Sequence, residues 1–255
     1  MKCFEQHVGP QVPIPCSSVG AFFLFFTRTL LEYIVMQSNK YALECMGAEK
    51  YESWEKITVD ELSAFIGFML LMGIVHLPSI ADYWKRDEVC HYAPVARRIS
   101  RNRFFDIQRY LHFADNSTLA APGTPEYKRL GKIQPIIDSL LGRFQAVYNL
   151  HRDVSVDEAM VAFKGRSTLK QYMPMKPVKR GFKVWMLADA HTGYVSGFEV
   201  YTGKKGDTVE KGLGPGVVKA LCQPLQHRYL CCLTNLHWML LLTWFYSPQV
   251  PSRLL

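Results

Sequence analysis

Two stretches of alternating side chains flank a short turn, and they constrain the fold of this chain more than any other feature. GFKVWMLADA (181–190) and YVSGFEVYTG (194–203) are joined by His191-Thr192-Gly193. Because successive residues of a strand point to opposite faces, the pattern predicts a β-hairpin. One face would carry Phe182, Val184, Met186 and Ala188, and the other Trp185 and Leu187. The Val-rich segment DVSVDEAMVAF predicts a further strand at 153–157.

The residues before 150 have helical instead of alternating periodicity. We predict helices at 19–43, 58–75, 100–113 and 135–148. The second has an N-terminal signal, because Thr58 can cap the helix and Glu61 follows three residues later. After the hairpin, 208–225 is predicted to be helical and YLCCL (229–233) to be a strand. The order of elements predicts an α/β fold with a helical N-terminal region followed by a mixed sheet.

Composition restricts the kinds of partner. Hydrophobic residues make up 49% and charged residues 20%, as in a packed globular protein, and the net charge is +8. A positive charge favours a polyanionic partner, nucleic acid or an anionic membrane surface, and its clustering favours nucleic acid. The apolar run AFIGFMLLMGIV (64–75) is too short to span a bilayer, so we predict neither a membrane segment nor a membrane partner.

Cysteine usage indicates a reducing compartment. The seven cysteines are irregularly spaced and include no Cys-x-x-Cys pair. This argues against a secreted disulfide framework and against a zinc ribbon. Cytosol or nucleus fits better than the cell exterior.

Two adjacent acids, Asp157 and Glu158, lie at the predicted strand before a basic stretch. Adjacent residues of a strand point to opposite faces, so at most one of the two serves a given site. Such a carboxylate is suited to Mg²⁺, which binds one or two carboxylates together with phosphate oxygens. From the spacing alone, an ordinary surface acid beside a basic face is the commoner explanation of such a carboxylate.

The stretch that follows contains no acid from Ala159 to Lys183. Pro174 and Pro177 exclude a regular helix there, so we predict an extended basic loop. It either tracks DNA phosphates or is simply solvated, and the unbalanced charge favours the first interpretation. The candidate DNA-binding residues are Lys164, Arg166, Lys170, Lys176, Lys179, Arg180 and Lys183.

The segment VSVDEAMVAFKGRSTLKQYMPMKPVKRGFKVWMLADAHTGYVSGFEVYTGK resembles the core signature of piggyBac-type transposases and their domesticated relatives. LLEYIVMQSNKYA, SRNRFFDIQRYLHFADN, KIQPIIDSLLGRF and EKGLGPGVV resemble further family segments, in family order. The resemblance implies an RNase H-like catalytic fold of the DDE/D type, with three Asp residues and Mg²⁺. It also implies a mostly helical dimerisation and DNA-binding region before it, DNA as a partner, and a nuclear location.

Carried over residue by residue, the resemblance makes Asp157 the first catalytic Asp and a metal ligand. The second Asp is expected in the segment CLTNLHW, where Thr234 occupies its position, and the third would lie beyond Leu255. Asp189 and Asp207 match no family position, and we expect both to be structural or solvated. One carboxylate cannot replace three, so we expect Mg²⁺ not to be productively bound.

The resemblance therefore implies a transposase-derived DNA-binding remnant without catalytic activity of its own. Two alternatives remain open. One is an active Mg²⁺-dependent, cut-and-paste transposase when full length or complemented. The other is a non-enzymatic regulator that forms a homodimer, or a heterodimer with a full-length relative.

We predict four segments along the chain. Residues 1–18 would be extended, 19–150 mostly helical, and 151–228 the N-terminal part of an incomplete RNase H-like domain. Residues 229–255 would form a divergent tail, because the family resemblance stops after about Arg228. Codons compatible with CLTNLHW, shifted by one base, can encode Phe-Asp-Lys-Phe, so we interpret the tail as frame-shifted. Sequencing the locus would show whether a shifted frame continues into family-like sequence.

Overall fold

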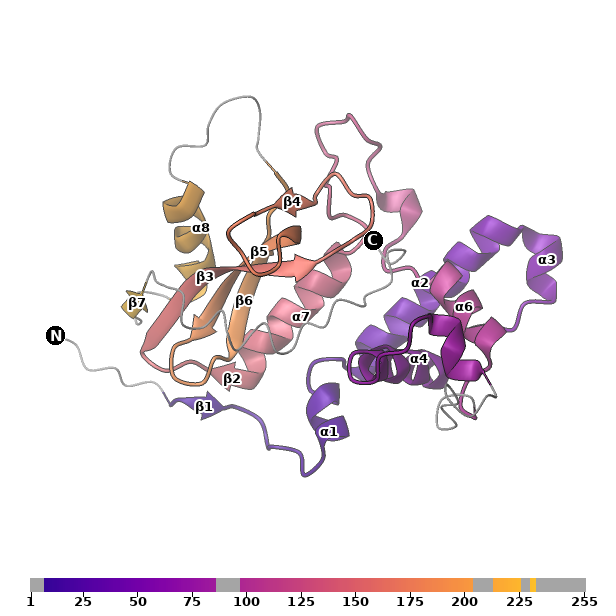
Figure 1. The fold of residues 1–255 in the computed structure, drawn as a ribbon, viewed down its shortest axis with the longest axis horizontal. Coiled ribbons are helices and arrows are strands. Elements are labelled where there is room, and N and C mark those ends of the chain that lie inside the picture. Colours follow the sequence, from indigo (N-terminus) through magenta and orange to yellow (C-terminus); the bar gives the residue numbers. More distant parts are fainter. Residues whose placement is uncertain (1–6, 86–96, 204–212, 226–229, 233–255) are drawn as a thin grey trace. The chain divides into compact units, whose positions relative to one another are not determined.

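A computed structural model describes residues 7–85, 97–203, 213–225 and 230–232 of the chain (Figure 1). The described residues form two compact units. A sheet unit contains the residues up to Phe25 and those from Ile137 onward, and a helical unit runs from Phe26 to Ile136. Thr234, Asp207 and most of the predicted tail lie outside the described residues.

The helical unit is built around a cluster of aromatic rings. Phe104 stacks on Phe65 at 4.8 Å and meets Phe68 edge-on at 4.8 Å, and Tyr83 also packs against Phe68. All four side chains are buried. The elements that supply them and their neighbours are α2 Arg28–Met46, α3 Ala48–Glu52, α4 Val59–Met72, η1 Ile80–Trp84, α6 Arg101–Tyr110 and η2 Asn116–Thr118.

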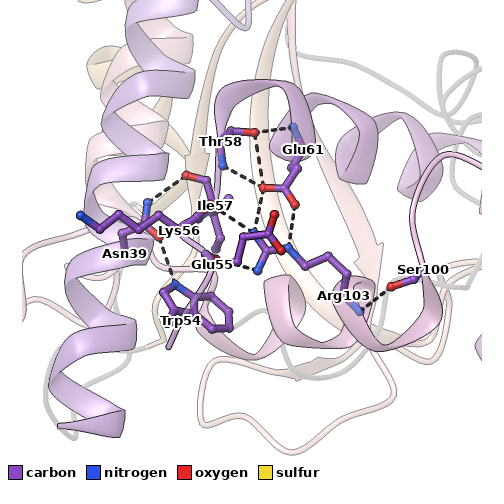
Figure 2. Close-up of polar contacts among 9 residues, drawn as sticks. All are labelled: Asn39, Trp54, Glu55, Lys56, Ile57, Thr58, Glu61, Ser100 and Arg103. Carbon is purple, nitrogen blue, oxygen red and sulfur yellow. Dashed lines mark hydrogen bonds and ion pairs between the residues drawn. The ribbon is translucent and has the colours of Figure 1, made fainter. Parts of the chain in front are cut away.

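The start of α4 confirms the predicted capping signal. The Thr58 side chain accepts a hydrogen bond from the Glu61 backbone N–H, and the Glu61 carboxylate accepts one from the Thr58 N–H (Figure 2). Together they satisfy two of the N–H groups that a helix leaves unpaired at its first turn. The helix ends at Met72, three residues before the predicted end, and α6 likewise ends early, at Tyr110.

The prediction of one helix over 19–43 is wrong. The chain forms α1, Ser18–Phe23, and then α2, which begins at Arg28. Thr27 causes the break: its backbone is extended and its hydroxyl accepts a hydrogen bond from the Leu30 N–H, so it caps a new helix. Within the described ranges no single helix is both long and apolar enough to cross a membrane, and only the bent pair 18–25 and 28–46 passes that test when counted together.

The sheet unit has a five-stranded mixed sheet in the order β4-β5-β3-β7, with β6 also pairing with β5. β5 is antiparallel to β3, β4 and β6, whereas β7 is parallel to β3. A smaller sheet pairs β1 Gly9–Pro10 with β2 Tyr148–Asn149. The strands of the larger sheet are β3 Asp153–Ala162, β4 Gln171–Tyr172, β5 Arg180–Asp189, β6 Val195–Val200 and β7 Leu230–Cys232.

The predicted hairpin is present, and its side chains point as expected. Its turn contains Gly193 at a positive φ of 73°, a conformation that glycine adopts without strain. On one face, Leu187 joins Val154 and Val156 in a buried core that Val218 and Leu221 of α8 (Leu213–Cys222) help to cover. On the other face, Phe198, paired with Met186, contacts Phe144 of α7 (Gln134–Val147). The sheet therefore lies between two helices (Figure 1).

Strand β3 is longer than the sequence predicted. We expected it to end at Asp157, but it continues to Ala162 because Glu158–Ala162 pair with Gly181–Trp185 of β5. Asp157 therefore lies in the middle of a strand and not at its end. The short strand predicted at 229–233 is β7, and the helix predicted at 208–225 is described from Leu213 as α8, with η3 Gln223–Leu225 after it.

Candidate functional site

Asp157 stands on β3 opposite Met186 of β5, on the sheet face that Phe144 of α7 also approaches. Its side chain is half-buried. It makes no hydrogen bond or ion pair with any residue in the described part of the chain. The Asp157 carboxylate, on this face of the sheet, is therefore able to accept hydrogen bonds or to bind a cation.

Glu158 points to the opposite face and is already neutralised. Its Oε2 atom lies 2.9 Å from the Lys183 ammonium, and the two side chains are 23% and 13% exposed. The two groups form an ion pair, but the angle between them does not meet the geometry of a hydrogen bond. Lys183 also lies over the rings of Trp185 and Tyr201, at 4.4 and 5.5 Å. Of the two adjacent acids, only Asp157 remains available to a ligand.

The candidate DNA-binding residues, apart from Lys183, lie on an ordered excursion between β3 and β5, which we call the basic arm (residues 163–180). Backbone hydrogen bonds close it at two levels: Phe163 N–H to Arg180 O (3.3 Å) and Met173 N–H to Lys179 O (2.8 Å). Between them, β4 pairs with the start of β5 (Figure 1). Gly181 at the base approaches β3 so closely that a Cβ there would stand 1.9 Å from the Val161 carbonyl oxygen.

The basic side chains of the arm differ in their exposure to solvent. Lys164, Arg166, Lys179 and Arg180 are exposed. Lys170 is half-buried, and its ammonium donates to the Gly165 carbonyl at 2.7 Å, so part of its hydrogen-bonding capacity is used within the arm. Lys176 is also half-buried. The arm therefore offers solvent a set of exposed cations, with Lys183 held apart by Glu158.

The arm also exposes two large hydrophobic side chains, whose importance the sequence did not reveal. Tyr172 is 61% exposed and Met175 is 94% exposed. The Arg180 guanidinium lies 5.2 Å from the Tyr172 ring centroid. In the sequence Tyr172 looks like an interruption of the basic run; its place beside Arg180 follows from the register of β4 on β5.

Of the two roles expected for Asp189, structural or solvated, the structure shows the structural one. It ends β5, is 1% exposed, and accepts hydrogen bonds from the backbone N–H groups of His151, His191 and Thr192. The His151 ring nitrogen Nδ1 lies 2.9 Å from its Oδ2. Burial by itself would raise the pKa of Asp189, but these hydrogen bonds hold the pKa below its ordinary value.

Comparison with known proteins identifies the family. The family model described as Transposase IS4 matches residues 17–236. The human PiggyBac transposable element-derived protein 2 is 32% identical over 231 residues, which are 88% of this chain and 36% of that protein. The human PiggyBac transposable element-derived protein 3 is 31% identical over 193 residues, 76% of this chain and 30% of the relative.

A solved structure agrees with these relatives. The cryo-EM structure of the piggyBac transposase synaptic complex with hairpin DNA matches with a TM-score of 0.71 and 27% identity, covering 86% of this chain and 46% of that one. The fold is thus the mixed α/β fold of the RNase H-like DDE transposases. This chain belongs to the piggyBac-type transposase family and spans 36% of the length of the human protein 2. Both the family resemblance and the fold class predicted from the sequence are confirmed.

The family implies a divalent metal ion, and the described residues do not complete a site for one. Within them, no group of three or more His, Cys, Asp or Glu side chains is placed to bind a metal. Asp157 supplies a single carboxylate. β7 is described as far as Cys232, which pairs with Ser155. Thr234 follows Cys232 by two residues, as Asp157 follows Ser155, but it lies outside the described residues.

Proposed function

We propose that this chain is a transposase-derived DNA-binding protein that does not cleave DNA on its own. The observation that carries the proposal is the basic arm, an ordered excursion with exposed Lys164, Arg166, Lys179 and Arg180 and no acid to balance them. Cations held on a fixed backbone suit a row of phosphates. The solved relative was captured with hairpin DNA, which supports DNA as the partner.

The proposed loss of cleavage rests on position 234. The family resemblance expects a carboxylate there, and Thr234 offers a neutral hydroxyl instead. Mg²⁺ requires hard, negatively charged oxygen ligands, and two-metal phosphoryl transfer requires several of them. With Asp157 as the remaining member, the ion would lose much of the charge that holds it.

Charge removal on the arm tests DNA binding. The double variant Lys164→Gln/Lys179→Gln is expected to reduce the slope of log K against log salt by about 2 on duplex DNA, because each lost phosphate contact removes about 0.9. The matched control Lys50→Gln/Lys132→Gln removes the same charge from exposed sites outside the arm and is expected to change the slope by less than about 0.5. Fluorescence anisotropy titrations at several salt concentrations measure both. An arm variant that keeps the slope of the unchanged protein would show that the arm is not the interface.

A cleavage assay tests the other half of the proposal. Purified protein is expected to leave supercoiled plasmid uncut in Mg²⁺ or Mn²⁺, at the level of the Asp157→Asn variant. Nicking by the unchanged protein that disappears in Asp157→Asn would favour an active transposase instead.

We also propose that the protein is located in the nucleus and that it forms a dimer, either with a second copy of itself or with a full-length relative. DNA as the partner supports the first, and the family's helical dimerisation region supports the second. A fluorescent fusion excluded from the nucleus would contradict the location. Light scattering that gives a monomer mass, alone and with the relative, would contradict the association.

A further inference from the structure

The C-terminal half of the basic arm carries an exposed aromatic ring, Tyr172, whose position is fixed by strand pairing. Tyr172 of β4 pairs directly with Arg180 of β5, so their side chains are cross-strand neighbours. The guanidinium lies 5.2 Å from the ring centroid, within the range of a cation–π contact. The ring is nevertheless 61% exposed. Arg180 therefore supports the ring from one side while much of its surface faces solvent.

The turn that follows β4 presents an apolar side chain to water. Met175 is 94% exposed, and it lies between Pro174 and Pro177 in a turn held by the Met173 N–H to Lys179 O and Lys176 N–H to Met173 O hydrogen bonds. The two prolines each fix one backbone dihedral angle, so the turn holds Met175 outward. A single exposed apolar side chain is ordinary on a protein surface, so Met175 is informative here because the same segment also exposes Tyr172.

Phosphate binding explains the cations of the arm but neither of these side chains. Phosphates are charged and hydrated, so they make little favourable contact with an aromatic ring or a thioether. Bases that have left the stack expose a flat apolar face, and aromatic side chains on basic surfaces stack on such faces with little dependence on sequence. Methionine is among the side chains that proteins insert between base steps.

We propose that the C-terminal half of the basic arm, residues 171–180, binds DNA in which bases are unpaired or unstacked. Tyr172, supported by Arg180, stacks on an exposed base, Met175 fills the gap beside it, and Lys179 neutralises the adjoining phosphate. This inference rests on the proposed DNA binding and specifies the form of DNA that the arm prefers.

Two oligonucleotides of the same sequence test it, a full duplex and a duplex with a short unpaired gap that contains 2-aminopurine. We expect the unchanged protein to bind the gapped DNA about tenfold more tightly and to change the fluorescence of the analogue. Tyr172→Ala should lose most of the preference and the fluorescence change, whereas Tyr172→Phe should keep both. Met175→Ala should lose a smaller part of the preference. The control is Tyr127→Ala, which removes another exposed tyrosine, 43% exposed and outside the arm.

Each other outcome overturns the inference. If Tyr172→Ala keeps the preference for gapped DNA, stacking by this ring is wrong. If it leaves DNA binding unchanged but alters the oligomeric state, this half of the arm is a protein contact. Salt-dependent binding of both DNAs with equal affinity would refute the inference and leave the proposed function standing. Absence of any salt-dependent DNA binding would refute both.

Discussion

Replacing Asp189 by Ala is expected to destabilise the sheet unit by about 3–5 kcal/mol, among the largest effects of any single substitution in this chain. The carboxylate is buried at the end of β5 and receives hydrogen bonds of 2.6 Å from the His151 N–H and 2.9 Å from the His191 and Thr192 N–H groups. Without it, three backbone N–H groups lose an acceptor that is itself buried. The hairpin turn and the entry to β3 would both lose their anchor.

The variant Asp189→Asn tests the contribution of the charge, because it keeps the shape of the side chain. The amide nearly preserves the volume but keeps only one acceptor oxygen, and its NH₂ group would face donors. We expect a loss of about 1–3 kcal/mol, smaller than for Ala because no cavity forms. The matched control is Asp153→Ala: Asp153 has a 46% exposed side chain, with only a 3.6 Å contact to His191, and should cost less than about 1 kcal/mol.

The pH dependence has a definite sign. The pKa of Asp189 is lower in the folded protein than in the unfolded chain, so its stabilisation is complete above the unfolded value of about 4 and declines as the pH falls through the folded pKa. The difference between the unchanged protein and Asp189→Ala should therefore be constant near neutral pH and shrink below about pH 4. A difference that grew on acidification would contradict this account.

Hydrogen exchange read peptide by peptide is the appropriate measurement, because the two units need not unfold together. Asp189→Ala should accelerate exchange of the β5 and β6 amides that are most protected in the unchanged protein. Amides of α4 and α6, which belong to the helical unit, should change little. Equal acceleration in both units would mean that the effect is not local to the hairpin.

Sequence predicted those features of the fold that depend on neighbouring residues. The hairpin at Gly193 and the capping box at Thr58 are local patterns, and both are present. The break at Thr27 is local too, but the apolar periodicity that continues on both sides of it hid the cap. The end of β3 was missed because it is set by pairing with β5, a strand that begins well beyond it in the sequence.

Some features of the candidate site could likewise be predicted from local sequence, and others depend on strand pairing. Alternation along β3 correctly separated Asp157 from Glu158, and composition correctly located the basic arm. Composition could not show that Lys183 is committed to Glu158, since that pair joins two strands across the register. The same register brings Arg180 over Tyr172. Which cations remain free is thus a property of strand pairing and not of the sequence near each cation.

The second large effect is expected in the helical unit, at Arg103. Arg103→Ala should destabilise this unit by about 2–4 kcal/mol. Its guanidinium makes a two-pronged contact with Glu61, Nε to Oε1 at 2.6 Å and Nη2 to Oε2 at 2.8 Å (Figure 2). The two side chains are only 14% and 28% exposed, so solvent screens this pair less than a surface pair.

Arg103 also joins α6 to the segment before α4. Nη1 donates to the Glu55 carbonyl at 2.8 Å and Nη2 to the Lys56 carbonyl at 3.2 Å, while the guanidinium lies 5.0 Å from the Trp54 ring centroid. A single planar group on α6 therefore holds both the first turn of α4 and the segment before it. Lysine has no such fork, so Arg103→Lys should recover only part of the loss, leaving a deficit of about 1–2 kcal/mol.

Acidification should reduce the effect of the Arg103 substitution. Burial by itself would raise the pKa of Glu61, but the hydrogen bonds from Arg103 and Thr58 hold it below its ordinary value. The pair therefore contributes fully above about pH 4 and loses its contribution as the pH falls further. Urea unfolding at pH 7 and near pH 3 should show a smaller gap between the unchanged protein and Arg103→Ala at the lower pH.

The control is a salt bridge of the same chemistry without the burial. Arg28 and Glu32 lie 2.9 Å apart on α2, with side chains 79% and 53% exposed. Since water screens such pairs and their side chains lose entropy on pairing, Arg28→Ala should change stability by less than about 0.5 kcal/mol. If both arginine substitutions cost the same, the two-pronged contact and the carbonyl links at Arg103 add nothing beyond charge. If only Arg103→Ala is costly and Arg103→Lys restores full stability, charge matters and the fork does not.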